Sequence, residues 1–296
     1  FGRVPNPETP FLLASITKPM TATAVMILSD RGKLSPSDPV RKHIPEFHGG
    51  DRDLITITHL LTHTSGLPDM LETNTELRQR HAPLKDFVKG ACQTPLLFKP
   101  GSKTKYQSMG ILLAGEVVER VTQTRLRDFL RKEVYRPLAM ERTSLGLGGR
   151  AISATALAQT PDETDWNWNS PYWRDLGVPW GGAHATAADV AKLLQCFLQG
   201  GGPILKPATA QAMITDQNPG LDPWGIGWML KPGTFGKACS PRTFGHYGST
   251  GTVAWADPQS KVTCVLLTTR PASDSRHGLL GPVSDLVAEG AKSSVQ

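Results

Sequence analysis

The sequence lacks long apolar runs and clustered charge. None of its apolar stretches approaches the roughly 20 residues that a helix needs to cross a bilayer, so no membrane span is predicted. The 32 basic and 26 acidic residues are interspersed, and the basic ones stand singly or in pairs. Because a nucleic-acid surface needs clustered basic residues, we expect the net charge of +6 to be solvated surface and no nucleic acid to be a partner.

Cysteine is also scarce and never occurs in a C-x-x-C pair, which argues against structural zinc and thioredoxin-like chemistry. Whether a disulfide joins any of the cysteines stays open, and so does the compartment, since Phe1 is not a translation start. His59 and His63 have the i, i+4 spacing of metal ligands, but Leu60 replaces the glutamate of H-E-x-x-H and no third ligand is evident. We therefore expect structural histidines, and neither a metal nor a cofactor. The cysteines are Cys92, Cys196, Cys239 and Cys264.

The composition is ordinary for a globular protein, with 39% hydrophobic and 20% charged residues. The length indicates two domains or one large one. Between residues 56 and 138 nothing is typical of a strand. Helical periodicity marks residues 84–93, 109–120 and 126–134 instead. Thr186 begins a variant capping box, which predicts a helix over residues 187–198.

The character of the sequence changes after about residue 222. Strands are predicted over residues 224–230, 252–256 and 262–268, with a four-residue hairpin connection at 257–260. Because residues 262–267 are almost continuously apolar, we expect them to form a central strand covered on both faces. A helix over residues 279–291 is predicted to close the chain.

The stretch from Ala14 to Lys18 places a hydroxyl and an amine at the start of a helix. The apolar run after it predicts a buried helix to residue 30 or 31, with Gly32 as its C-terminal cap. Lys18 then lies one turn after Ser15 and points from the same face. A partly desolvated lysine can take the proton of a serine hydroxyl and so make it nucleophilic. The S-x-x-K tetrapeptide alone is common by chance. The alternative interpretation is that Ser15 only caps the helix and that Lys18 is solvated.

Two further clusters can serve the same chemistry. Tyr106 follows a turn with three lysines within seven residues, and a nearby cation lowers the pKa of a phenol, so Tyr106 is a candidate base. The alternative is a tyrosine packed by its ring. Glycines interrupt the edge-like strand around His246 and Gly248, which often marks close approach of a ligand or of another backbone. A backbone N–H there can complete an oxyanion hole with the N–H of Ser15.

Taken in order, the three clusters resemble the three motifs of the serine β-lactamase/penicillin-binding superfamily. They are Ser15-x-x-Lys18, Tyr106-x-Ser108 and His246-x-Gly248. The sequence is most similar to the class C-like group, which includes family VIII carboxylesterases and relatives of D-alanyl-D-alanine carboxypeptidases. The similarity covers almost the whole chain, and its connecting segments are LLASITKPMTA, ITHLLTHTSGL, FKPGSKTKYQSMG, GGAHATAADVAKLL and FGHYGSTGTVAWADP.

The resemblance implies a catalytic role for each of four residues. Ser15 would be the acylated nucleophile, and Lys18 would accept its proton or act as the electrostatic partner of the base. Tyr106 would be the base that relays the proton to the leaving group. The backbone N–H groups of Ser15 and Ser249 would form the oxyanion hole.

The same resemblance assigns substrate contacts to Ser108, His246 and Gly248. Ser108 stands where many relatives carry asparagine. His246 replaces the lysine of the third motif, so a fixed cation for a β-lactam or peptide carboxylate is lost, because histidine is mostly neutral at pH 7. That departure favours neutral esters. A loop rich in Pro, Asn and Gly carries five aromatic residues, which are Trp166, Trp168, Tyr172, Trp173 and Trp180. They are candidates for a wall of the substrate pocket. The alternative is that they form a small core that anchors the loop.

The implied fold is α+β, an antiparallel sheet flanked by helices with a mainly helical domain beside it and the site between them. The expected division is a sheet domain of residues 1–55 and 215–296 and a helical domain of residues 56–214. Family members usually have several tens of residues ahead of S-x-x-K, whereas 14 precede Ser15 here. We therefore expect the N-terminal strands to be short or missing. The sheet then lacks an edge, is completed by another chain in a homo-oligomer, or belongs to a shortened chain.

Three functions follow, in order of preference. The first is a serine carboxylesterase that acts on short- to medium-chain esters through a covalent acyl-enzyme. The second is a D-amino-acid peptidase or β-lactamase that uses the same site on small amides. It needs a carboxylate anchor, for which Arg174, Arg242 and Arg270 are candidates. The third is a non-catalytic binding or assembly module, against which the three intact motifs argue.

Overall fold

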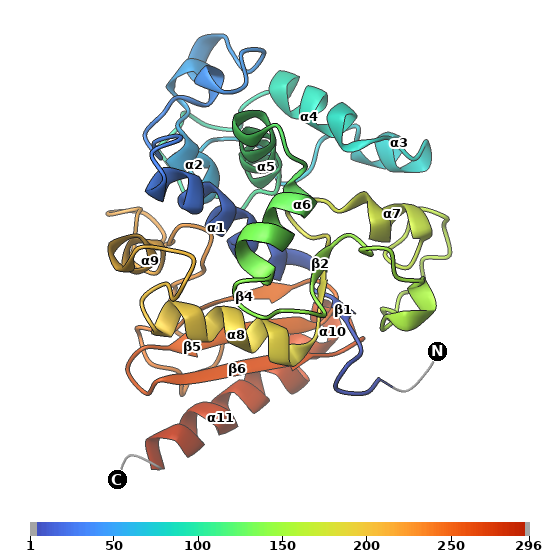
Figure 1. Cartoon of the computed structure of the whole chain (residues 1–296), viewed down its shortest axis with the longest axis vertical. Coiled ribbons are helices and arrows are strands. Elements are labelled where there is room, and N and C mark those ends of the chain that lie inside the picture. Colours follow the sequence, from blue (N-terminus) through green and yellow to red (C-terminus); the bar gives the residue numbers. More distant parts are fainter. Residues whose placement is uncertain (1–4, 294–296) are drawn as a thin grey trace.

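The structure is a computed structural model that describes residues 5–293. Figure 1 shows a group of helices, α2 to α5, on one side and a sheet with the helices α8 and α11 on the other, with α1 between them. The α-helices are α1 (Thr17–Asp30), α2 (Ile57–Leu61), α3 (Asn74–Gln79), α4 (Leu84–Gln93), α5 (Met109–Thr122), α6 (Leu126–Leu130), α7 (Pro171–Leu176), α8 (Ala187–Leu198), α9 (Pro207–Met213), α10 (Ala272–Ser275) and α11 (Gly281–Ser293). The strands are β1 (Phe11–Leu12), β2 (Ser144–Leu145), β3 (Ala183–Ala185), β4 (Phe244–Gly248), β5 (Thr252–Asp257) and β6 (Val262–Leu267). The α+β class expected from the sequence is confirmed.

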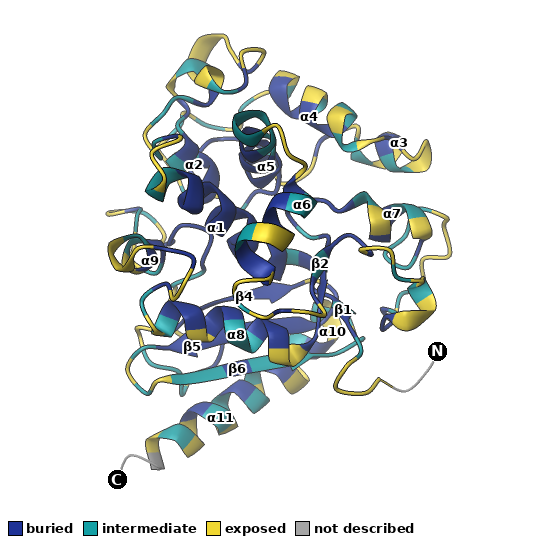
Figure 2. Ribbon diagram, in the orientation of Figure 1, coloured by how far each residue is buried: buried dark blue, intermediate teal, exposed yellow. Residues whose placement is uncertain are grey.

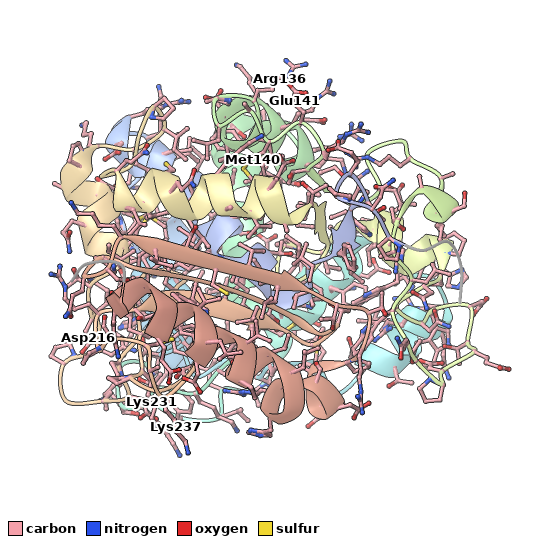
Figure 3. All side chains as sticks on the ribbon, turned by 90° about the horizontal axis from the view of Figure 1, so that it is seen from below. Arg136, Met140, Glu141, Asp216, Lys231 and Lys237 are labelled. Carbon is pink, nitrogen blue, oxygen red and sulfur yellow. The ribbon has the colours of Figure 1, made fainter. Side chains whose placement is uncertain are left out.

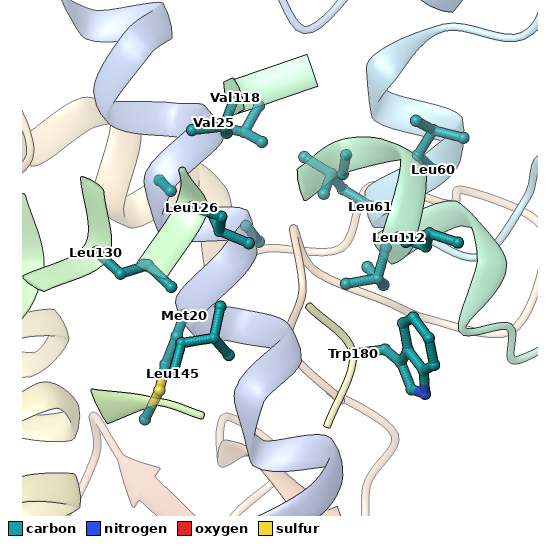
Figure 4. Close-up of a cluster of buried hydrophobic side chains, with 14 of the residues drawn as sticks. Met20, Val25, Leu60, Leu61, Leu112, Val118, Leu126, Leu130, Leu145 and Trp180 are labelled. Carbon is teal, nitrogen blue, oxygen red and sulfur yellow. The ribbon is translucent and has the colours of Figure 1, made fainter. Parts of the chain in front are cut away.

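Helix α1 is the element around which the core is built. It is buried from its first residue to Leu28, because threonine, alanine and large apolar residues occupy nearly every position and leave no polar face. Figure 4 shows Met20 and Val25 of α1 among apolar side chains of α2, α5 and α6. Each fully buried side chain of this kind contributes about 1.5–3 kcal/mol. The helix is therefore a rigid support for the side chains at its N-terminus.

The two described sheets are antiparallel and have three strands each, in the orders β1-β3-β2 and β4-β5-β6. Strand β5 is the central strand of the second sheet and is buried throughout. The hairpin predicted at residues 257–260 joins it to β6. The expectation that residues 262–267 form a central strand is wrong, because β6 is an edge strand of the described sheet and most of it is half-buried. Helices α8 and α11 both contact β6, so its apolar character reflects covered faces and not its position in the hydrogen-bond order.

The strand predicted over residues 224–230 is also wrong. The structure has isolated bridges there, Trp224 with Met229 and Met229 with Gly245. Two glycines explain the difference, because a Cβ on Gly225 would lie 2.2 Å from the carbonyl oxygen of Met213, and one on Gly227 would lie 2.6 Å from Ala22 of α1. This segment is held by close backbone contact with the helices and not by a ladder.

The predicted helices are confirmed with small changes at their ends. Residues 84–93 and 187–198 are helical with the predicted bounds, and the Thr186 side chain accepts a hydrogen bond from the N–H of Asp189. The helix predicted over residues 126–134 divides into α6 and a π-helical turn. Figure 2 shows that burial is concentrated in α1, α5 and the strands β4 and β5.

A second, smaller core lies between the sheet and α11. It is centred on Trp255 of β5, whose indole N–H donates to Ser284 Oγ at 3.0 Å. All four cysteines are free, and three of them are buried. Within residues 5–293 no helix combines the length and the apolar character that crossing a membrane requires.

Candidate active site

Ser15 lies in a single 3-10 turn, Ala14–Ile16, that leads into α1. Ala14 has a left-handed φ of 47°, which costs a residue with a side chain about 1–2 kcal/mol. Strand β3 holds this turn in place, since Leu13 N–H donates to Ala183 O at 2.8 Å and Ala183 N–H donates to Thr17 Oγ1 at 3.0 Å. Backbone strain of this kind is typical of functional positions.

Lys18 meets Ser15 as the sequence predicts. Its Nζ lies 3.1 Å from Ser15 Oγ and donates to the carbonyl oxygen of Trp180 at 3.0 Å. The side chain is fully buried, and burial lowers the pKa of Lys18 to about 7, although attraction to Asp69 acts in the opposite direction. Near pH 7 a substantial fraction of the amine is therefore neutral and able to accept a proton.

Tyr106 is the third side chain at this point. Its hydroxyl hydrogen-bonds with Ser15, and the Lys18 Nζ lies 4.7 Å from the centre of its ring. The expectation that neighbouring lysines lower its pKa is wrong. Burial raises the pKa of Tyr106, the hydrogen bond with Ser15 offsets this only in part, and the three lysines before it are exposed. The phenol therefore keeps its proton at neutral pH.

Ser108 and Asp69 lie next to these three residues. Ser108 Oγ donates to Asp69 Oδ1 at 2.6 Å, and both residues line the same cavity as Ser15. The sequence analysis missed Asp69, although it lies two residues after the family-like segment that ends in Ser65-Gly66-Leu67. Its proximity to Lys18 depends on the fold, so spacing alone gave no sign of it.

His246 does not line the cavity. It is buried, its Nδ1 lies 2.6 Å from the carbonyl oxygen of Tyr247, and its ring centre lies 6.0 Å from that of Tyr106. Burial, together with repulsion from Lys18, lowers the pKa of His246 to about 3. The side chain is thus neutral at pH 7 and offers no cation for a substrate.

The two predicted structural histidines both bond to the backbone, as expected. His59 completes a capping box with Thr56 at the start of α2. His63 Nδ1 accepts from the N–H of Gln107 at 3.1 Å. Its ring centre lies 4.8 Å from that of Tyr106, so His63 also forms part of the wall behind the phenol. Burial holds the pKa of His63 well below its ordinary value.

The backbone N–H groups of Ser15 and Ser249 are the candidate oxyanion hole. Among the described residues neither of them donates a hydrogen bond, and both residues line the cavity. Gly248 makes the predicted close approach to backbone, since a Cβ there would lie 2.1 Å from the carbonyl oxygen of Leu13. Thr250 Oγ1 donates to Leu12 O at 2.6 Å, which holds the turn after β4 against the segment before Ser15.

The cavity at Ser15 has a volume of about 350 Å³. Trp168, Trp173 and Trp180 line it, whereas Trp166 does not and instead stacks on Arg78. The loop has no core of its own among the described residues, because Trp173 and Trp180 belong to the main hydrophobic core and Trp168 and Tyr172 pack against it. Tyr172 also donates its hydroxyl to the carbonyl oxygen of Ala82 at 2.8 Å. Trp173 and Trp180 therefore anchor the loop to the main core and also line the cavity, and their role as a substrate wall stays a prediction.

The arginines proposed as carboxylate anchors are not in this cavity. Arg174 is buried and bonds to the carbonyl oxygens of Trp168 and Ala156, to Thr155 Oγ1 and to Asn169 Oδ1. Arg242 and Arg270 do not line the cavity either. The arginine that does is Arg78 of α3, which the sequence analysis missed.

A larger cavity, of about 700 Å³, lies beside α6 and has an arginine-rich lining. Figure 3 shows Arg136 and Glu141, two of its residues, at the molecular surface. It contains neither Ser15 nor Lys18, so it is not the candidate active site. Its arginines are Arg125, Arg127, Arg131, Arg136 and Arg150.

Fold and contacts together define a hydrolase of the serine type. The sequence profile of the Beta-lactamase family matches residues 2–289, and the chain belongs to that family. One relative is the protein of Escherichia coli (strain K12) named "Putative D-alanyl-D-alanine carboxypeptidase". It is 32% identical over 303 residues, which cover 88% of this chain and 69% of the relative.

Solved structures of the same fold agree. A penicillin-binding protein homologue from Caulobacter crescentus has a TM-score of 0.80 at 25% identity, and the alignment covers 99% of this chain and 86% of that one. A family VIII carboxylesterase has a TM-score of 0.82 at 21% identity, with 96% and 84% covered. At that identity the second likeness shows the fold alone.

Proposed function

We propose that the protein is a carboxylesterase that hydrolyses short- to medium-chain esters through a covalent acyl-enzyme at Ser15. The observation that carries the proposal is the 3.1 Å separation of Lys18 Nζ from Ser15 Oγ, with the pKa of Lys18 lowered to about 7. An amine with that pKa is matched to general-base work at neutral pH. The Tyr106 phenol, which stays protonated, is suited to donating and passing on a proton.

In the proposed reaction, neutral Lys18 takes the proton of Ser15 Oγ as that oxygen bonds to the ester carbonyl carbon. The N–H groups of Ser15 and Ser249 hold the resulting oxyanion. As the carbonyl re-forms, the ester C–O bond breaks, and the proton on Lys18 passes through the Tyr106 phenol to the departing alkoxide. Water then attacks the acyl-enzyme and gives a proton to Lys18. As the carbonyl re-forms, the bond between Ser15 Oγ and the acyl carbon breaks, Lys18 returns this proton to Ser15 Oγ, and the carboxylic acid is released.

A D-amino-acid peptidase or β-lactamase acting at the same site is the second candidate. One observation favours it, since the Arg78 guanidinium lines the cavity and offers a cation where His246 offers none. Comparing kcat/KM for nitrocefin and for p-nitrophenyl butyrate separates the two candidates. The third hypothesis, a non-catalytic module, is set aside because the chain belongs to a hydrolase family. The homo-oligomer stays a prediction.

The acyl-enzyme proposal predicts covalent labelling of Ser15. A p-nitrophenyl alkylphosphonate should add one phosphonyl group to the folded protein and release one equivalent of p-nitrophenol. Mass spectrometry of the digest should locate the group on Ser15, because this hydroxyl has Lys18 as its base. Ser15→Ala should take up none while keeping the circular dichroism of the parent. Continued turnover of p-nitrophenyl butyrate by Ser15→Ala would exclude the mechanism.

The pH profile tests the assignment of Lys18 as the base. Because only the neutral amine accepts a proton, kcat/KM should rise with pH through a single ionisation near pH 7 and then level off. The buried histidines should add no second step, since the pKa of His246 is lowered to about 3 and that of His63 also lies well below its ordinary value. A flat profile between about pH 5 and pH 9 would contradict the assignment.

A further inference from the structure

Helix α3 presents two polar side chains to the cavity that holds Ser15. Asn74 and Arg78 are four residues apart, so they share one face of the helix, and both line the cavity. The Arg78 guanidinium carbon lies 4.9 Å from the ring centre of Trp166 and 4.0 Å from that of Trp173, and its Nη2 donates to the carbonyl oxygen of Trp166 at 2.6 Å. Stacking and this hydrogen bond together fix the plane of the guanidinium.

Arg78 has hydrogen-bond donors that the protein does not use. Its Nε is buried and has no acceptor, and its Nη1 bonds to none of the described residues. No described carboxylate lies within ion-pair distance of it, although Asp162 and the Tyr172 hydroxyl attract it from farther away. Asn74 Oδ1 on the same helix face is likewise buried without a partner. Partly buried polar groups left in this state carry an uncompensated desolvation cost.

Arg174 shows what a structural arginine looks like in the same loop. Arg174 is fully buried, whereas Arg78 is half-buried. The Arg174 guanidinium nevertheless donates to four acceptors, and none of its three nitrogens is left without a partner. Arg78 has one acceptor and borders a cavity. The difference points to a ligand as the missing partner of Arg78.

We propose that Arg78 binds a carboxylate at the far end of the substrate's acyl group. The substrate class is then monoesters of short dicarboxylic acids, or acyl groups with a comparable terminal carboxylate. This inference rests on the proposed function, since it names the substrate class for the cavity at Ser15. A planar guanidinium with free N–H groups is the side chain best matched to a carboxylate.

The aromatic wall sets the direction of the acyl group. Ser15, Arg78 and the two tryptophans Trp173 and Trp180 line the same cavity. The Trp180 and Trp173 ring centres are 6.3 Å apart, and the Arg78 guanidinium carbon lies 4.0 Å from the ring centre of Trp173. An acyl chain that starts at Ser15 and follows these two indoles therefore ends at Arg78. Asp69 lies beside Ser108 near the reacting end, where it disfavours a carboxylate in the opposite orientation.

The test compares matched esters. The p-nitrophenyl monoesters of succinate, glutarate and adipate are each paired with the same compound whose free carboxylate is capped as a methyl ester. For each pair we take the ratio of kcat/KM for the anionic monoester to kcat/KM for its neutral methyl ester. In the parent protein this ratio should exceed one for at least one chain length. Arg78→Met should lower that ratio about tenfold or more, the size expected for a charge-assisted hydrogen bond. Arg78→Lys should fall between, because an ammonium keeps the charge and loses the stacked fork.

Taking the ratio within each variant cancels any loss of active protein. Arg80→Met is the matched control, since Arg80 follows α3, is exposed, pairs with Asp86 at 2.8 Å and does not line the cavity. It should leave the ratio unchanged. A ratio that is the same in the parent and in Arg78→Met would overturn the inference and leave the esterase proposal standing.

A binding measurement separates failure of the inference from failure of the proposed function. Ser15→Ala should bind the monoanilide of glutarate with a saturable change in tryptophan fluorescence, because the carboxylate meets a guanidinium stacked on two indoles. The methyl ester of the anilide should bind more weakly, and Ser15→Ala with Arg78→Met should lose the difference. If Ser15→Ala binds in this way but the parent protein hydrolyses no ester, the role of Arg78 is upheld and the esterase proposal is rejected. Neither binding nor hydrolysis would reject both.

Discussion

Replacing Lys18 by methionine is expected to lower kcat/KM for p-nitrophenyl butyrate by about 1,000-fold or more, within the range for loss of a positioned base. The same change is expected to stabilise the fold at neutral pH. Burial lowers the pKa of Lys18 from 10.5 to about 7, and each unit of such a shift corresponds to about 1.4 kcal/mol. The hydrogen bonds to Ser15 and Trp180 return part of that cost, so we expect a net gain of about 1–3 kcal/mol.

The sign of the pH dependence follows from proton binding. Between the folded pKa of about 7 and the unfolded value of 10.5, the unfolded chain holds a proton on Lys18 that the folded protein lacks. The free energy of unfolding of the parent therefore rises with pH across this window. The advantage of Lys18→Met should be full below pH 7 and should shrink as the pH approaches 10.5.

Urea unfolding of the two proteins at pH values near both ends of the window, together with the ester kinetics, measures both effects. Lys89→Met is the control, since Lys89 is exposed on α4 and does not line the cavity. It should change neither quantity by more than a small amount. A stability difference between Lys18→Met and its parent that does not vary with pH would mean that the buried amine is not the group responsible.

How much the sequence could predict depends on whether a signal is local. The helix at residues 84–93 was found with its bounds because its apolar spacing and its ends lie in one segment. The false strand at residues 224–230 has strand-like side chains, but two of its backbone N–H groups donate to the carbonyl oxygens of Met213 and Leu61, which no local pattern reveals. The division of the chain at residues 55 and 214 stays a prediction.

The same limit applies to the site. Ser15 and Lys18 are one helical turn apart, so their meeting could be predicted from spacing. The raised pKa of Tyr106 could not be predicted, because it results from burial. The lysines next to Tyr106 in the sequence indicate a lowered pKa instead. Arg78 was missed because the indoles that hold it are 88 and 95 residues away in the chain, and no motif connects them.

Gly248→Ala is expected to damage stability and catalysis together. A Cβ at this position would lie 2.1 Å from the carbonyl oxygen of Leu13 and 2.2 Å from Thr252 Oγ1. Neither can move freely, since Thr252 Oγ1 donates to that same carbonyl at 2.9 Å. Forcing the strand and the segment apart should cost about 3 kcal/mol of unfolding free energy, at the upper end for overpacking. Gly278→Ala, where a Cβ would meet nothing within 4 Å, is the control and should change little.

The catalytic part of this prediction follows from the position of Gly248. Leu13 is two residues before Ser15, and Gly248 is the residue before Ser249, so the clash moves apart the two N–H groups proposed to hold the oxyanion. Loss of one such donor typically lowers kcat by about 100- to 1,000-fold. The rate is taken per folded site, counted by phosphonate labelling, so that lost stability is not mistaken for lost catalysis. An unchanged kcat per labelled site in Gly248→Ala would mean that Ser249 does not serve the oxyanion, because its N–H cannot keep its distance to Ser15 while the carbonyl of Leu13 is displaced.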